Sequence, residues 1–215
     1  VSASFGITHA QNLPTYIPAN SLVGWWPFNG NANDESGNGN HGMVTGAQLS
    51  ADRYNNANHS YSFNGISDHI YVPSTGITSV MRTTVSAWLK YTGDAGGFNN
   101  DSYFQFGERS ASAYQHSMAY GYRYVDKVFG LYHPCKVSEF PGFDINDSWH
   151  NVIIVHDSNI MKMYIDAVLI DSVNSTDTVC YMGTNSIWIG ASPSDSQYVT
   201  GEIDDIGFWT RALNL

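Results

Sequence analysis

The sequence predicts an all-β protein, folded as a two-sheet antiparallel β-sandwich. Short segments in which apolar and polar residues alternate recur along the chain, as in strands with one buried face. Turn-forming residues separate these segments, and no long stretch has the apolar period of an amphipathic helix. A chain of 215 residues with 14% aromatic and 13% charged residues suits one sandwich, a fold that commonly reaches roughly 200 to 250 residues.

The expected strands begin at Leu22, after a lead-in segment at residues 1–20 that contains Pro14 and Pro18. The chain is therefore divided into this lead-in and one domain at residues 21–215. In chain order the strand candidates are LVGWWPF, SYSFNG, HIYVP, TTVSAWLKY, SYFQFG, HSMAYGYRY, VFGLYH, HNVIIVHD, MKMYIDAVLIDSV, SIWIG and GEIDDIGFW.

Two of these segments predict local geometry in detail. In TTVSAWLKY, Val85 and Leu89 share one face and Trp88 lies on the other, so one face packs and the other can meet a ligand. In MKMYIDAVLIDSV, Asp166 and Ala167 separate two alternating runs, which is the place of a tight hairpin turn. No repeat of solenoid or propeller period is present.

The charge of the chain excludes some partners. The net charge is −10 and there are only nine Lys and Arg residues, whereas nucleic-acid binding needs a basic surface. Anionic membranes are disfavoured for the same reason. No apolar run reaches the roughly 18 residues that a membrane span needs, so membrane insertion is not expected.

Two cysteines, Cys135 and Cys180, leave two possibilities open. They can form one disulfide, which closes a loop of roughly 45 residues and persists only in an oxidising compartment. They can equally be two separate buried thiols. Neither has the neighbours of a catalytic nucleophile.

The stretch NGNANDESGNGNHG, residues 29–42, contains five asparagines, four glycines and two acids. Glycine and asparagine tolerate left-handed backbone angles, so such a loop can fold tightly and turn its oxygen atoms inward. That arrangement suits a hard cation, which prefers carboxylate, amide and carbonyl oxygens. A plain polar surface loop has the same composition.

Several segments together resemble the laminin-G-like, concanavalin A-like jelly-roll domains that are common in secreted bacterial proteins. The matching pieces are LVGWWPFNGNANDESGNGNHG, SYSFNGISDHIYVP, TTVSAWLKYTG, DSWHNVIIVHDSNIMKMYIDAVLIDS and GEIDDIGFWTRAL. They cover most of residues 21–213. The region from Phe98 to Phe143 follows no pattern of the family.

The resemblance implies a structural calcium ion where the loop at 29–42 meets the acidic pair Asp204–Asp205. Asp34 and Asp204 are then the charged ligands, and Asn29 and Asn40 supply amide oxygens. Other loop residues could replace these amides: Asn31, Asn33, Asn38 and His41.

Enzymes share this fold, but their motifs are incomplete here. Hydrolases of the laminarinase type place two carboxylates on one strand, about 5 to 5.5 Å apart. GEIDDIGFW offers Glu202 and Asp204, but Ile206 and Gly207 follow where the second glutamate belongs. A lyase would need an arginine-rich strand, and only Arg109 comes near it. We therefore expect no catalytic activity.

A carbohydrate-binding site needs flat aromatic rings and planar polar groups, and these are dense in the unmatched region. The predicted glycan-binding residues are Trp88, Gln105, Arg109, His116, Tyr120, Tyr122, Tyr132 and His133. Any one of them could instead cover a half-buried sheet face. Trp25 and Trp88 are expected to be exposed, and the other tryptophans, Trp26, Trp149, Trp188 and Trp209, to lie in the core.

These observations favour a noncatalytic carbohydrate-binding or adhesive module that is stabilised by calcium. The expected partner is a polysaccharide or glycan, and the expected location is secreted or at the cell surface, as part of a larger protein. The alternatives are a structural or protein-interaction module and, on the same fold, a polysaccharide lyase or glycoside hydrolase.

Overall fold

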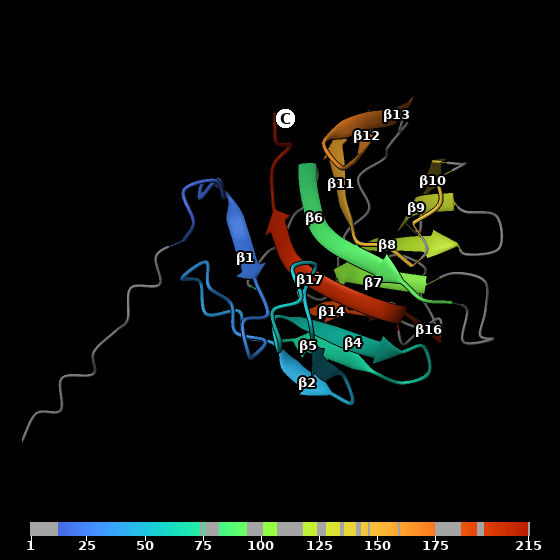
Figure 1. The fold of residues 1–215 in the computed structure, drawn as a ribbon. Helices are drawn as coiled ribbons and strands as arrows, with labels where there is room; N and C mark the ends of the chain where they lie inside the picture. Colours follow the sequence, from blue (N-terminus) through green and yellow to red (C-terminus); the bar gives the residue numbers. More distant parts are fainter. Residues whose placement is uncertain are drawn as a thin grey trace, which may run out of the picture.

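The structure is a computed structural model that contains two β-sheets packed face to face (Figure 1). It describes residues 13–73, 75, 82–93, 101–106, 118–123, 128–133, 136–140, 143–145, 147–158, 160–174, 186–192 and 196–214. All strand pairings in these segments are antiparallel, and none of their residues is helical. The predicted fold class is therefore confirmed. The described residues include no helix long and apolar enough to cross a bilayer.

The eight-stranded sheet has the order β13-β12-β11-β6-β17-β4-β3, with β1 also paired to β17. Its strands are β1 (Leu22–Trp26), β3 (Gln48–Ser50), β4 (Ser60–Asn64), β6 (Arg82–Tyr91), β11 (His150–Asp157), β12 (Ile160–Ile165), β13 (Val168–Asn174) and β17 (Thr200–Trp209). The last strand, β17, thus lies between β6 and β4, and the first strand, β1, pairs with its C-terminal part.

The seven-stranded sheet has the order β10-β9-β8-β7-β14-β5-β2. Its strands are β2 (Met43–Thr45), β5 (His69–Val72), β7 (Asp101–Phe106), β8 (Met118–Arg123), β9 (Val128–His133), β10 (Lys136–Phe140) and β14 (Ile187–Ile189). A short pair, β15 (Ala191–Ser192) and β16 (Gln197–Tyr198), forms a separate sheet. The region without a family pattern thus supplies β7 to β10, which lie side by side.

The core lies between the two sheets because strands of both turn alternate apolar side chains inward. Phe104 of β7 and Phe208 of β17 meet with ring centroids 5.1 Å apart. On β6, Val85 and Leu89 are fully buried, whereas Trp88 is half-buried. The predicted alternation of this strand is confirmed.

The predicted hairpin at Asp166–Ala167 is also confirmed. Both residues have positive φ, 49° and 66°, as a two-residue turn between twisted strands requires. Ile165 and Val168 pair on either side of the turn. The hairpin joins β12 to β13 at the edge of the eight-stranded sheet.

A second, smaller apolar cluster joins the lead-in to the sandwich. Leu22, Trp25 and Trp209 are buried together, and Leu13 and Ile17 pack against them. Trp25 was expected to be exposed, but its side chain is only 4% exposed. The expectation was wrong because the lead-in covers the face of β1 that the alternation turns away from the main core.

Candidate functional site

Three aromatic side chains form a half-buried cluster on the seven-stranded sheet, which we call the aromatic row: His69, Tyr71 and Trp188. In β5 and β14, Ile70, Val72, Ile187 and Ile189 are fully buried, so the alternating residues turn away from the core. The Trp188 ring centroid lies 4.6 Å from that of Tyr71 and 5.0 Å from that of His69. The result is a continuous aromatic surface on two adjacent strands.

The strand register continues from the aromatic row into the neighbouring strands of the sheet. Trp188 is paired with Tyr71 on one side and Gln105 on the other. Gln105 is paired with Ala119, and Ala119 with Tyr132. Two of the predicted glycan-binding residues, Gln105 and Tyr132, are thus in cross-strand register with Trp188.

The other predicted glycan-binding residues are distributed differently. Tyr120 and Tyr122 belong to β8, where they pair with Leu131 and Phe129 of β9. His133 ends β9, opposite Lys136. The remaining predictions, Arg109 and His116, lie outside the described residues, as do both cysteines of the predicted disulfide, Cys135 and Cys180.

Trp88 lies on the other sheet, so the structure does not bring it to the aromatic row. Its ring instead covers a guanidinium group: the Cζ atom of Arg53 lies 4.3 Å from the Trp88 ring centroid. The Tyr54 ring lies on the same group, with a centroid distance of 4.7 Å. Contacts of this length between a cation and an aromatic face are attractive.

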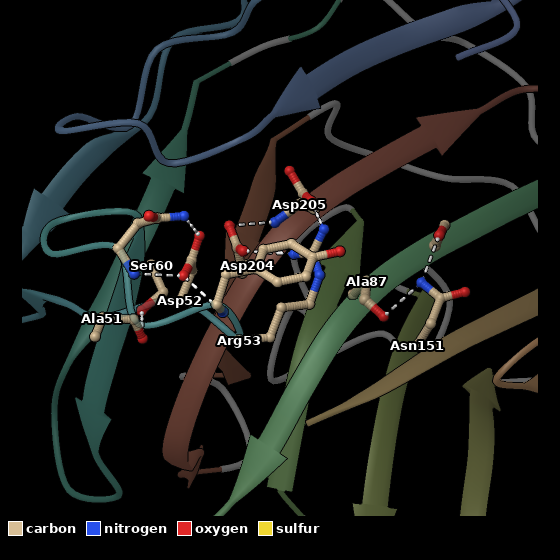
Figure 2. Close-up of polar contacts among 11 residues, drawn as sticks. Ala51, Asp52, Arg53, Ser60, Ala87, Asn151, Asp204 and Asp205 are labelled. Carbon is tan, nitrogen blue, oxygen red and sulfur yellow. Dashed lines mark hydrogen bonds and ion pairs between the residues drawn. The ribbon is translucent and has the colours of Figure 1, made fainter. Parts of the chain in front are cut away.

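Arg53 also binds the acidic pair Asp204–Asp205 (Figure 2). Its Nη1 donates to Oδ2 of Asp204 at 2.9 Å, and its Nη2 donates to Oδ2 of Asp205 at 2.8 Å. The Arg53 side chain is 17% exposed and that of Asp204 is 4% exposed. The charges are thus largely shielded from water. Ion pairs in such a buried environment interact more strongly than pairs at the surface.

The surroundings shift the pKa values of both acids upward. Burial, and next the neighbouring Asp205 carboxylate, raise the pKa of Asp204 to about 8, although Arg53 opposes the shift. Burial also raises the pKa of Asp205, against the lowering effect of Arg53. One guanidinium therefore compensates two carboxylates only in part.

The loop at 29–42 folds around Asp34, which is 1% exposed. Oδ1 of Asp34 accepts the backbone N–H groups of Trp25 at 3.0 Å and Ser36 at 2.8 Å, and Oδ2 accepts that of Asn40 at 2.9 Å. The side-chain amide of Asn40 donates to the Val23 carbonyl at 2.7 Å. The loop is thus fixed to β1 by its own polar groups.

The residues predicted to share a calcium ion do not form one donor set. Asp34 accepts three backbone donors, whereas Asp204 is bound to Arg53, and no interaction between described residues joins these two acids. Asn29 is exposed. Among the described residues, no group of three or more acids, histidines or cysteines is arranged to hold a metal. As placed, the residues do not fit one shared ion, and calcium stays a prediction.

The strand that resembles a hydrolase motif has no second acid in place. Glu202 lies 3.4 Å from Nζ of Lys90, and Ile206 is fully buried in the core. Asp204 is engaged with Arg53. The arrangement gives no pair of free carboxylates on β17.

Two central residues of these sites were missed in the sequence. Trp188 was assigned to the core. In SIWIG, however, it stands between two isoleucines of an alternating strand, so its side chain points to the face opposite theirs. Arg53 had no signal of its own, because the sheet register and the β3–β4 loop bring it to β17 from 151 residues away.

A family model described as the concanavalin A-like lectin/glucanases superfamily, of laminin-G type, matches residues 64–215. Among curated proteins, none matches the chain. Many solved structures are similar in fold.

One of these structures is the ligand-binding domain of botulinum neurotoxin serotype D in complex with N-acetylneuraminic acid. It has a TM-score of 0.67 and 18% identity, over 91% of this chain and 49% of that chain. Another is domain 4 of AbnA, an extracellular arabinanase from Geobacillus stearothermophilus, in complex with arabinotriose, with a TM-score of 0.64 and 20% identity, over 90% of this chain and 94% of that chain. A third is the Trypanosoma rangeli sialidase, with a TM-score of 0.65 and 13% identity, over 92% of this chain and 32% of that chain.

The chain spans about half the length of the neurotoxin domains it matches. At these identities the structures show a shared fold. The family match covers most of the chain and includes the last strand, β17. The chain therefore belongs to the concanavalin A-like lectin/glucanases superfamily.

Proposed function

We propose that this chain is a noncatalytic carbohydrate-binding module that holds a glycan along the aromatic row of the seven-stranded sheet. The observation that carries the proposal is the contact of Trp188 with Tyr71 and His69 on the sheet face away from the core. Aromatic rings bind the apolar faces of sugars, and neighbouring polar groups fix their hydroxyls. His69 offers an imidazole for this purpose.

The register supports a site longer than one sugar. The row continues by backbone pairing from Tyr71 through Trp188 to Gln105, Ala119 and Tyr132. Adjacent strands are about 4.8 Å apart. The five neighbouring strands β5, β14, β7, β8 and β9 therefore span a length that suits an oligosaccharide. A polymer lying across the strands could therefore meet several of these positions at once.

Two of the similar structures were solved with sugars, one with N-acetylneuraminic acid and one with arabinotriose. This supports a glycan as the partner class. The net charge of −10 disfavours nucleic acid and acidic polymers in general. A neutral polysaccharide is accordingly the ligand class that we propose, for a module secreted or displayed at the cell surface within a larger protein.

The proposal is tested by retention on insoluble polysaccharides and by a glycan array. We expect the parent to bind at least one neutral glycan and Trp188→Ala to lose most of that binding. Tyr164→Ala is the matched control, because Tyr164 is a half-buried aromatic residue on β12 of the other sheet. Equal loss in both variants, or no loss in either, would contradict the aromatic row as the site.

The same samples test the absence of catalysis. Glu202 has a lysine partner and no second free acid on its strand, so incubation with a bound polysaccharide should release no reducing or unsaturated ends. Sustained product release that Glu202→Gln abolishes would show an enzyme instead.

A further inference from the structure

A bulge on β17 turns two consecutive acids toward one guanidinium. Consecutive residues of a regular strand point to opposite faces, yet Asp204 and Asp205 both bind Arg53. The register of β17 with β6 shifts between Asp204 and Gly207, and Asp205 has a positive φ of 48°. The backbone distortion therefore serves to bring both carboxylates to the same cation.

The loop that carries Arg53 is built to hold it there. Oδ1 of Asp52 accepts the backbone N–H groups of Tyr54 and Asn56, each at 2.8 Å. Oδ2 of Asp52 accepts the side-chain amide of Asn56 at 2.9 Å. At the base of the loop, the Ser60 hydroxyl donates to the Ala51 carbonyl at 2.9 Å (Figure 2). These hydrogen bonds thus fix the loop backbone on both sides of Arg53.

We infer that Arg53 is the resident cation of the acidic pair Asp204–Asp205, in the place where the family resemblance implied calcium, and that it fastens the β3–β4 loop to the last strand. The guanidinium uses one oxygen of each acid. The second oxygen of Asp204 accepts the backbone N–H of Asp205 at 2.8 Å. Calcium needs six to eight oxygens at about 2.3 to 2.6 Å, which these groups cannot supply while Arg53 is present.

The inference predicts a change of ligand when Arg53 is removed. The buried carboxylate of Asp204 and the half-buried carboxylate of Asp205 then lose their cation and repel each other. A divalent ion can compensate both, so the truncated site should accept calcium that the parent excludes. Arg53→Lys keeps one positive charge but cannot bind two carboxylates in the same planar geometry, so it should be less stable than the parent and gain no response to calcium.

The experiment compares melting temperatures in calcium and in chelator for the parent, Arg53→Ala, Arg53→Lys and Arg53→Ala/Asp204→Asn. We expect Arg53→Ala to melt below the parent and to gain about 5 °C from calcium at one hundred times its Kd, beyond any response of the parent. The double variant should lose this gain. If Arg53→Ala does not fold, Arg53→Gln, which keeps most of the stem, replaces it.

Two outcomes would overturn the inference. One is an Arg53→Ala protein that is as stable as the parent or gains no calcium response. The other is a parent that calcium already stabilises through Asp204, shown by loss of that response in the single variant Asp204→Asn. Glycan retention is a separate readout, so failure here leaves the aromatic row untouched.

Discussion

The rings of Trp188 and Tyr71 meet across the β14–β5 pair with a centroid distance of 4.6 Å and an angle of 49° between their planes. The two residues are directly opposite in the strand register. Each ring therefore limits the positions of the other and keeps a fixed aromatic surface outside the core.

Replacement of Tyr71 should weaken glycan binding by loosening Trp188. Aromatic pairs at this distance contribute about 0.5 to 1.5 kcal/mol beyond their area burial, so Tyr71→Ala should reduce affinity by about two- to tenfold. Tyr71→Phe keeps the ring and should retain most of the binding. Calorimetric titration with a bound oligosaccharide measures both. Unchanged affinity in Tyr71→Ala would show that the ring pair has no part in the site.

The stability of the fold should fall as pH rises from 5 to 9. Burial and the Asp205 carboxylate raise the pKa of Asp204 to about 8, above its value of about 3.9 in an unfolded chain. The folded state thus binds the proton more tightly, and this contribution, complete at low pH, is lost as pH passes the folded pKa. Asp205, whose pKa is also raised, acts in the same direction.

Denaturant unfolding at pH 5, 7 and 9 measures this dependence. Asp204→Asn should flatten it, because the amide does not titrate. A parent that becomes more stable between pH 7 and 9 would contradict the assignment.

Asp34 should be essential for stability whether or not the loop binds metal. Asp34→Ala leaves three backbone N–H groups without their acceptor, which we expect to lower the free energy of unfolding by about 2 to 4 kcal/mol. Asn29→Ala, an exposed change in the same loop, should cost less than about 0.5 kcal/mol. Equal stability of the two variants in denaturant unfolding would disprove this role.

The predicted calcium ion is tested separately from Arg53. If the loop at 29–42 binds calcium through Asp34, chelator should lower the melting temperature of the parent, and Asp34→Ala should remove that shift. Asp204→Asn should leave the shift in place, because Asp204 is bound to Arg53. Metal analysis of the purified protein provides the independent check. A chelator-insensitive parent without bound calcium would leave residues 29–42 as a hydrogen-bonded loop.

The sequence predicted features that local patterns determine. The alternation in β6 separated Val85 from Trp88, and Asp166–Ala167 marked a turn, because both signals are confined to a few neighbouring residues. Trp25 was misjudged since its cover, Leu13 and Ile17, comes from a segment without periodicity. The contact of Arg53 with Asp204 depends on sheet order and on a bulge, neither of which a local pattern records.

The lead-in should stabilise the domain, although the sequence analysis placed it outside the domain. Nε1 of Trp209 donates to the Pro18 carbonyl at 2.7 Å, and Leu13 and Ile17 pack on the cluster around Trp209. A chain that starts at residue 21 exposes this apolar surface and leaves the indole N–H without its acceptor, so it should lose about 2 to 4 kcal/mol of stability. Its tryptophan emission should also shift to longer wavelength. A chain that starts at Leu13 is the control, and equal melting temperatures of the two chains would show that the lead-in contacts contribute nothing.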